Sequence, residues 1–288
     1  MNKPENSLFP SFTTRVPRQE QVGHCAARRR NELRIFETSA GSAHSFRCYS
    51  QTFPGFLKIA ELAGFKRTVA PSPHVKNLVI TGASGGLGKA LAVAFADVGW
   101  DVGTPSRSEL DVTDPKAMRS YFESRPIDLL VCAAGIVRDA PLALMRENQW
   151  DEVFAVNYQG AANCAAAVLP GMIRRGHGHI VFISSYSALH PATGQAAYAA
   201  SKAALLGLAS DLAARHGASN IRINSVLPGF METRMTQAVS GPRKTQILAD
   251  HTLGRFNTPD AVAKFIRHLH EDLPHTSGQV FQLDSRIS

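Results

Sequence analysis

The hydrophobic pattern of this chain changes near residue 75. Beyond that point, short uninterrupted apolar runs alternate with longer stretches in which apolar residues recur at helical spacing. Apolar runs occupy 78–80, 129–131, 180–183, 223–227 and 280–281, and helical stretches 86–98, 115–124, 150–175, 195–216 and 260–269. Strands that lack an alternating polar face are buried on both sides, as in a parallel sheet covered by helices. The order predicts a doubly wound α/β domain, a class that binds ligands at the carboxyl ends of its strands.

Residues 1–74 have a different character. They mix polar, basic and turn-forming residues without sustained periodicity, and they end in a linker-like stretch that contains Pro71 and Pro73. Only 56–65 resembles a short amphipathic helix. We interpret 1–74 as an irregular N-terminal extension rather than a functional module. It is either a mobile tail or the result of a start residue assigned too far upstream. Residues 75–288 then form a single domain.

The charge distribution argues against nucleic acid as a partner. The formal net charge is +8, but residues 1–74 contain 11 Lys and Arg against 5 Asp and Glu, whereas 75–288 contain 20 against 18. The main domain therefore lacks the basic stripe that a phosphate backbone requires.

The cysteines and the hydropathy indicate a chain of the cytoplasm. Four cysteines form neither a CxxC pair nor a cluster with metal-ligand spacing, so we expect free thiols and no metal site. No apolar run is long enough to span a bilayer, and the first residues do not resemble a secretory signal. A mitochondrial transit peptide is conceivable from the arginines at 28–30, but acidic residues nearby weigh against it.

A glycine-rich turn follows the first predicted strand and opens the first predicted helix. Glycines allow positive φ and let the backbone approach a pyrophosphate closely, and the helix N-terminus attracts the anion. Any tight strand–helix turn favours glycine, but the strand and the helix are both present here, which indicates dinucleotide binding. The turn reads Thr81-Gly82-Ala83-Ser84-Gly85-Gly86-Leu87-Gly88.

Two further groups carry candidate chemistry. Tyr198 and Lys202 are four residues apart in a predicted helix, so they share one face, and the lysine cation, aided by an oxidised nicotinamide, is expected to lower the pKa of the phenol. Ser185 ends the predicted strand before that helix and could bind the same substrate oxygen as Tyr198. Asn157 lies within a predicted helix although asparagine favours helices poorly; it marks a capped bend, a solvated position or a buried amide near Lys202. Taken singly, each of these residues has an ordinary structural explanation.

Together these motifs resemble the short-chain dehydrogenase/reductase family, over about 75–284. The glycine turn resembles the family's TGxxxGxG, and Asn157, Ser185, Tyr198 and Lys202 match its catalytic tetrad. The resemblance further implies cofactor contacts from an acidic dipeptide, from the loop after the third predicted strand and from a PG motif: Asp111, Val112, Ala133, Ala134, Gly135, Pro228, Gly229 and Thr233. The most similar branch is the 3-oxoacyl-[acyl-carrier-protein] reductase-like enzymes.

This resemblance implies a Rossmann fold with seven parallel strands and a reductase that acts by hydride transfer. Ser185 and Tyr198 would bind the substrate carbonyl, Tyr198 would donate the proton, and Lys202 would hold the nicotinamide ribose. Asn157 would support a proton relay through water. The implied context is fatty acid biosynthesis by a homo-oligomer, a dimer or tetramer, acting on an acyl thioester that an acyl carrier protein could present.

The chain departs from the family pattern in three places. Cys132-Ala133-Ala134-Gly135 stands where NNAG is usual, Asp284-Ser285-Arg286 replaces DGG, and the stretch between 104 and 110 leaves no room for the usual helix. We expect NADP(H) rather than NAD, because the second strand is followed by Arg107 and no acid before Glu109. The glycine turn has Gly85 where the family places another basic residue, so that second signal is missing.

Several alternatives stay open. The substrate could instead be a sugar, a steroid or another small ketone, a choice that the lid at about 231–255 would decide. A non-catalytic dinucleotide-binding regulator on the same scaffold is the alternative of another class. Two predicted helices end in arginines: Arg174, Arg175 and Arg215. The helix dipole favours cations at these ends, and a docking patch for an acidic carrier protein would explain the arginines equally well.

Overall fold

The computed structural model describes residues 75–287, and the predicted extension at 1–74, with its helix at 56–65, lies outside them. Six parallel strands form one sheet in the order β2-β1-β3-β4-β5-β6. They are β1 (Asn77–Thr81), β2 (Asp101–Gly103), β3 (Leu129–Cys132), β4 (Gly178–Ile183), β5 (Ile221–Leu227) and β6 (Val280–Gln282). All residues of β3 and β4 are buried, as their uninterrupted apolar runs predict.

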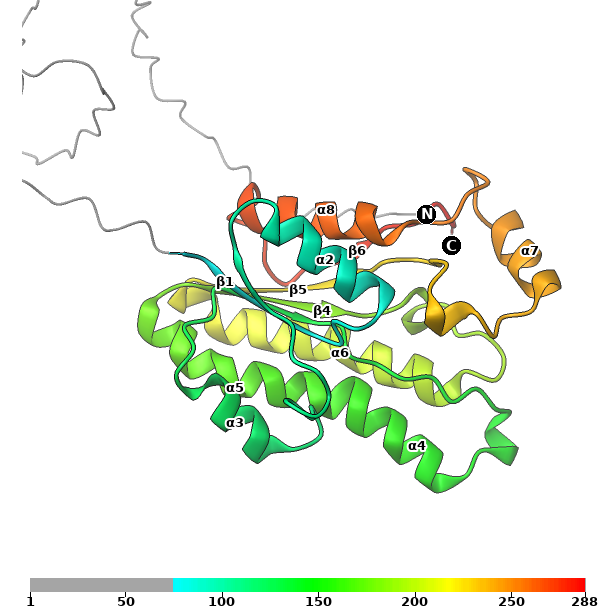
Figure 1. Cartoon of the computed structure of the whole chain (residues 1–288). Coiled ribbons are helices and arrows are strands. Elements are labelled where there is room, and N and C mark those ends of the chain that lie inside the picture. Colours follow the sequence, from blue (N-terminus) through cyan, green and yellow to red (C-terminus); the bar gives the residue numbers. More distant parts are fainter. Residues whose placement is uncertain (1–74, 288) are drawn as a thin grey trace, which may run out of the picture. The chain divides into compact units, whose positions relative to one another are not determined.

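Helices cover both faces of the sheet, which confirms the doubly wound α/β class (Figure 1). Helices α2 (Gly86–Ala96) and α8 (Pro259–Glu271) pack on one face around Phe95 and Ile266. Helices α3 (Pro115–Glu123), α5 (Gly160–Arg175) and α6 (Ala196–His216) pack on the other around Met172 and Phe182. The helix predicted at 150–175 is interrupted: α4 (Glu147–Phe154) leads through a π-helical turn (Ala155–Gln159) into α5.

The expectation of seven strands is wrong for the described residues. The chain passes from β2 to α3 through 104–114 without a further helix or strand, because this stretch is too short for both. β2 is therefore the edge strand, and Tyr121 of α3 lies against it: a Cβ built on Gly103 would be 3.3 Å from the Tyr121 Oη. The predicted start of α3 is confirmed, since the Asp114 carboxylate accepts hydrogen bonds from the amides of Lys116 and Ala117.

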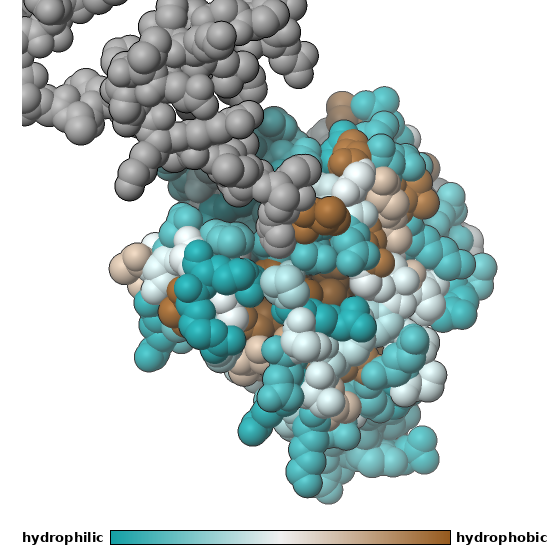
Figure 2. Space-filling view, turned by 60° about the vertical axis from the view of Figure 1, so that its left-hand side comes forward, coloured by the Kyte–Doolittle hydropathy of each residue, from teal (hydrophilic) through white to brown (hydrophobic). Residues whose placement is uncertain are grey.

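The surface agrees with a chain that keeps its large apolar side chains inside. Most of the face in Figure 2 is hydrophilic, with smaller apolar areas between the polar residues. Between residues 75 and 287, no helix is both long and apolar enough to cross a membrane. In that part of the chain Cys132 and Cys164 are free and buried, as expected for thiols.

Candidate active site

The loops that follow β1, β3, β4 and β5 all leave the sheet at the carboxyl ends of its strands, because the strands are parallel. The glycine turn follows β1, residues 133–135 follow β3, Ser185 follows β4, and Pro228 follows β5. The fold thus brings together segments that are more than 140 residues apart in the sequence.

The glycine turn is shaped so that side chains are excluded. Gly82 has φ of +73°, and a Cβ built on it would lie 2.7 Å from the backbone nitrogen of Ala134. A Cβ on Gly88 would lie 2.5 Å from Ala83 Cα. The amide of Gly85 donates to the Gly82 carbonyl at 3.0 Å, and α2 begins at Gly86 without a side-chain cap. The amides of its first turn are therefore available to an anion, so the turn fits a dinucleotide pyrophosphate.

The other predicted cofactor residues differ in their surroundings. Within the turn, Ser84 is exposed, whereas Leu87 is buried in the core. Thr233 lies over the turn, since a Cβ on Gly86 would be 2.9 Å from the Thr233 Cγ2. Gly229 adopts φ of +79° directly after Pro228, whose carbonyl accepts a hydrogen bond from the Asn257 side chain at 2.8 Å.

Arg107 and Asp111 lie in the stretch after β2, and they contact one another. The Arg107 Nε lies 3.4 Å from the Asp111 Oδ2, and 77% of the Arg107 side chain is exposed. Backbone and side-chain hydrogen bonds from Thr113 lower the pKa of Asp111. Val112, next to Asp111 in the sequence, packs against Gly160, where a Cβ would lie 2.7 Å from the Val112 side chain.

Asn157 is buried in the π-helical turn between α4 and α5. Its Oδ1 accepts from the amide of Ile136 at 2.8 Å, and its Nδ2 donates to the Ile136 carbonyl at 3.0 Å and to the Ser201 Oγ at 3.1 Å. The sequence allowed three interpretations of Asn157, and the structure shows the buried amide. Asn157 ties the loop after β3 to α6 next to Lys202, because a Cβ on Gly135 would lie within 3.4 Å of both side chains.

Ser185, Tyr198 and Lys202 converge at the end of β4. The Ser185 hydroxyl is near enough to the Tyr198 phenol to lower the pKa of the phenol against the larger effect of burial, and it accepts a hydrogen bond from the amide of Ser187 at 3.1 Å. The Lys202 Nζ lies 5.9 Å from the centroid of the Tyr198 ring and donates to the Ile183 carbonyl at 2.8 Å. The four residues of the expected tetrad therefore lie side by side.

Burial dominates the electrostatics of this cluster. It lowers the pKa of Lys202 from 10.5 to about 8, because the charged ammonium loses its hydration. It also raises the pKa of Tyr198, and the hydrogen bond with Ser185 opposes this shift only in part. The expected lowering of the Tyr198 pKa by Lys202, aided by an oxidised nicotinamide, stays a prediction, because burial alone sets the direction of the shift seen here.

A chain of hydrogen bonds that sequence reasoning missed ends at the same cluster. The Gln195 Nε2 donates to the Asp139 carboxylate at 3.1 Å, and the Ser187 Oγ donates to the Gln195 Oε1 at 3.0 Å. Asp139 also raises the pKa of Tyr198, after the larger effect of burial. No spacing signal could have revealed this set, since its members come from the loop after β3, the start of α6 and the turn after β4.

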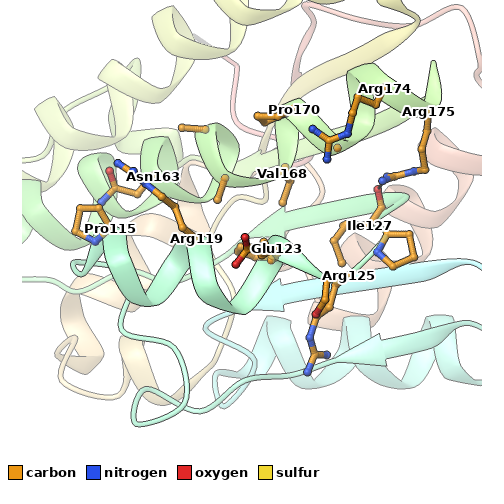
Figure 3. Close-up of a pocket in the computed structure, with 16 residues that line it drawn as sticks. Pro115, Arg119, Glu123, Arg125, Ile127, Asn163, Val168, Pro170, Arg174 and Arg175 are labelled. Carbon is orange, nitrogen blue, oxygen red and sulfur yellow. Dashed lines mark hydrogen bonds between the residues drawn. The ribbon is translucent and has the colours of Figure 1, made fainter.

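A large groove lies elsewhere, between α3 and α5 (Figure 3). Its volume is about 940 Å³, and none of the four tetrad residues lines it. Its walls carry Arg119, Arg125, Arg174 and Arg175 with the acidic Glu123. It is therefore a feature separate from the candidate active site.

Comparisons with known proteins agree with this geometry. Residues 103–285 match the family model described as enoyl-(acyl carrier protein) reductase. The chain is 36% identical over 239 residues to the 3-oxoacyl-[acyl-carrier-protein] reductase FabG of Thermotoga maritima, covering 74% of this chain and 97% of that relative. It is 33% identical over 220 residues to FabG of Escherichia coli, covering 68% and 90%.

Solved structures give the same result. A short-chain dehydrogenase/reductase family oxidoreductase from Burkholderia thailandensis is 27% identical with a TM-score of 0.68, covering 73% of this chain and 92% of that one. ElxO with NADP bound is also 27% identical with a TM-score of 0.68, covering 73% and 98%. By fold, by motif order and by these similarities, the chain belongs to the short-chain dehydrogenase/reductase family of NAD(P)-dependent oxidoreductases.

Proposed function

We propose that this member of the family is an NADPH-dependent reductase of 3-oxoacyl thioesters. The observation that carries the proposal is the convergence of Ser185, Tyr198 and Lys202 beside a glycine turn that excludes side chains. The thioester substrate is supported by the relatives named 3-oxoacyl-[acyl-carrier-protein] reductase, almost all of whose length is matched.

In the proposed mechanism, two hydroxyl groups bind the substrate carbonyl oxygen. When bound, the reduced nicotinamide supplies the hydride that reaches the carbonyl carbon. Tyr198 donates a proton to the oxygen as negative charge develops there, and burial, which raises the pKa of the phenol, favours the protonated form that a proton donor needs. Ser185 donates a second hydrogen bond to that oxygen and orients it.

Lys202 and Asn157 support the proton donor. The lysine ammonium, close to the Tyr198 ring, would stabilise the phenolate left after proton transfer and hold the nicotinamide ribose. With a pKa of about 8, it can also exchange protons at physiological pH. Asn157 fixes the loop after β3 against α6 and thereby supports a proton path to water.

The cofactor would be held by the glycine turn and the loops around it. The pyrophosphate would bind at the start of α2, the adenosine near the stretch after β2, and the nicotinamide near the loops after β3 and β5. These residues are Gly82, Ser84, Gly85, Gly86, Leu87, Gly88, Arg107, Asp111, Val112, Ala133, Ala134, Gly135, Pro228, Gly229 and Thr233.

We further propose that NADPH is preferred over NADH. Arg107 is largely exposed after β2, where an NAD-specific site would place an acid, and its guanidinium is available to a ribose phosphate. Replacing Arg107 with Ala should raise KM for NADPH and leave KM for NADH unchanged. A wild-type protein that prefers NADH in kcat/KM would contradict this part of the proposal.

An acyl carrier protein is the proposed source of the thioester. Arg174 lines the groove between α3 and α5 together with Arg119 and Arg125, which gives this face an excess of positive charge (Figure 3). Arg175 also lines the groove and donates to the Ile127 carbonyl, so it also has a structural role. Arg215 pairs with Asp211 at 2.8 Å and adds little to such a patch. A homo-oligomer, dimer or tetramer, in the cytoplasm remains part of the proposal.

The proposal is tested by following NADPH consumption by the full chain with a panel of carbonyl compounds. We expect reduction of acetoacetyl-coenzyme A and of an acetoacetyl carrier protein. Charge reversal at Arg174 should raise KM for the carrier-bound substrate and leave the coenzyme A thioester unaffected. Reduction of only a sugar, steroid or free ketone would overturn the thioester assignment, and equal effects on both thioesters would overturn the docking patch.

A further inference from the structure

The C-terminal segment contains a buried ion pair in which Asp284 keeps the acid of the DGG pattern and Arg286 stands in place of its last glycine. The Asp284 side chain is 0% exposed and the Arg286 side chain is 10% exposed. The Arg286 Nε donates to the Asp284 Oδ2 at 2.8 Å, and a terminal guanidinium nitrogen donates to the same oxygen. Burying two charges is costly unless their geometry is good, and a residue without a side chain would avoid that cost. The pair therefore needs an explanation beyond stability.

Arg286 lies against the residue that follows the catalytic serine. Its Cζ is 3.4 Å from the centroid of the Tyr186 ring, which is close contact between a guanidinium plane and an aromatic face. Tyr186 is joined directly to Ser185, and its ring also stacks on His190 with centroids 4.5 Å apart. The guanidinium thus restrains one side of the turn that presents the Ser185 hydroxyl.

The same segment binds the end of the lid. The Ser285 carbonyl accepts hydrogen bonds from the amide and the hydroxyl of Thr252, at 3.2 and 2.9 Å. The Ser285 Oγ accepts from the amide of Leu253 at 3.2 Å, and His251 forms an antiparallel bridge with Arg286. These lid residues directly follow α7 (Gly241–Ala249).

Asp284 also contacts the turn after β5, which contains Gly229. A Cβ built on Gly229 would lie only 2.5 Å from the Asp284 Cβ, so the turn after β5 packs directly on this side chain. The Gln282 side chain donates to the Asp284 Oδ1 at 3.0 Å and to the Arg286 carbonyl at 3.3 Å, which fixes the segment on β6. One short segment therefore joins the serine turn, the lid and the turn after β5.

We infer that Asp284, Ser285 and Arg286 form a C-terminal clamp in which Arg286 is a positioning residue: by stacking on Tyr186 it holds Ser185 in its productive orientation while the lid end is fixed to the same segment. The inference rests on the role proposed for Ser185. Arg286 acts through Tyr186 and does not need to touch the substrate.

The decisive variants are Arg286→Lys, Tyr186→Leu and their combination. Lysine keeps the charge beside Asp284 but lacks the flat guanidinium plane, so the fold should persist while the stack is lost. We expect each single variant to lower kcat about tenfold and the double variant to be no worse than either, because both remove one contact. The Kd for NADPH should stay within about twofold of the wild-type value, because the glycine turn is untouched.

Arg267→Lys is the matched control, because Arg267 also pairs with an acid, Glu271, but on α8 and apart from the serine turn. It should leave kcat unchanged. Wild-type kcat in Arg286→Lys, or effects of the two single variants that multiply in the double variant, would overturn the inference. The rates are measured with whichever carbonyl compound the wild-type protein reduces.

Hydrogen exchange of the full chain provides a readout that needs no substrate. Asp284→Asn combined with Arg286→Met removes both charges and leaves no unpaired ion in the core. Peptides covering 185–190 and 247–253 should then exchange faster than in the wild type, while a peptide covering α2 should not change. Unchanged exchange in both segments would overturn the clamp. If the wild type reduces no carbonyl compound, the proposed function fails, and exchange alone decides the clamp.

Discussion

Two histidines on the opposite side of the sheet from α6 should make the stability of this protein depend on pH. His179 of β4 and His270 of α8 stack with ring centroids 5.4 Å apart, and their Nδ1 atoms are 3.2 Å apart. Burial, with help from the cations Arg222 and Lys76, lowers the pKa of His270 from 6.5 to about 4, and Asp128 opposes this only in part. Burial also places the pKa of His179 well below its ordinary value.

The direction and size of the effect follow from these values. In the unfolded chain His270 takes up a proton as the pH falls through 6.5, but in the folded chain it stays neutral until about pH 4. The unfolded state therefore binds more protons in this window, and stability is lost as the pH falls. For His270 alone the loss is about 2 kcal/mol by pH 5 and at most about 3 kcal/mol at lower pH. His179 adds to it in the same direction.

The assay is urea unfolding followed by circular dichroism, near pH 8 and near pH 5, at one protein concentration. The free energy of unfolding of His270→Gln should fall between these two conditions by about 2 kcal/mol less than that of the wild type. The control is His268→Gln, because His268 lies on the same helix with 57% of its side chain exposed. It should behave like the wild type. An equal pH-dependent loss in His270→Gln and the wild type would refute the reasoning.

Further predictions concern the site itself. Tyr198→Phe should bind NADPH nearly as the wild type does but lose about 100-fold or more in kcat, whereas Lys202→Ala should impair both, as cofactor titration and steady-state rates would show. Near wild-type turnover in Tyr198→Phe would exclude the proposed proton donor. Asp139→Asn should lower the pKa of Tyr198, so the pH profile of alcohol oxidation, which needs the phenolate, should move to lower pH; an unmoved profile would contradict this. Gly82→Ala should weaken NADPH binding at least about tenfold, because its Cβ would enter the Ala134 backbone, whereas Gly99→Ala, with φ of +83° but open space around it, should not.

Some features of the site could be predicted because they depend on local sequence. The turn after β1 needs Gly82 for its positive φ, and Tyr198 and Lys202 share a face through the helical repeat. The absence of a helix after β2 was also predictable from chain length. The seventh strand was expected only from the resemblance to the family, and the same short stretch excludes it.

The sequence by itself determined the order of strands and helices and the parallel sheet, because apolar periodicity records burial locally. The tetrad was expected from motifs that resemble those of the family. Only the tertiary structure decided how deeply each group is buried and which distant groups meet. The pKa values of Tyr198 and Lys202 depend on desolvation, and the spacing of the two residues in the sequence does not reveal how deeply they are buried. The stack of Arg286 on Tyr186 joins residues a hundred positions apart, and such a contact arises because the parallel strands deliver their loops to one edge.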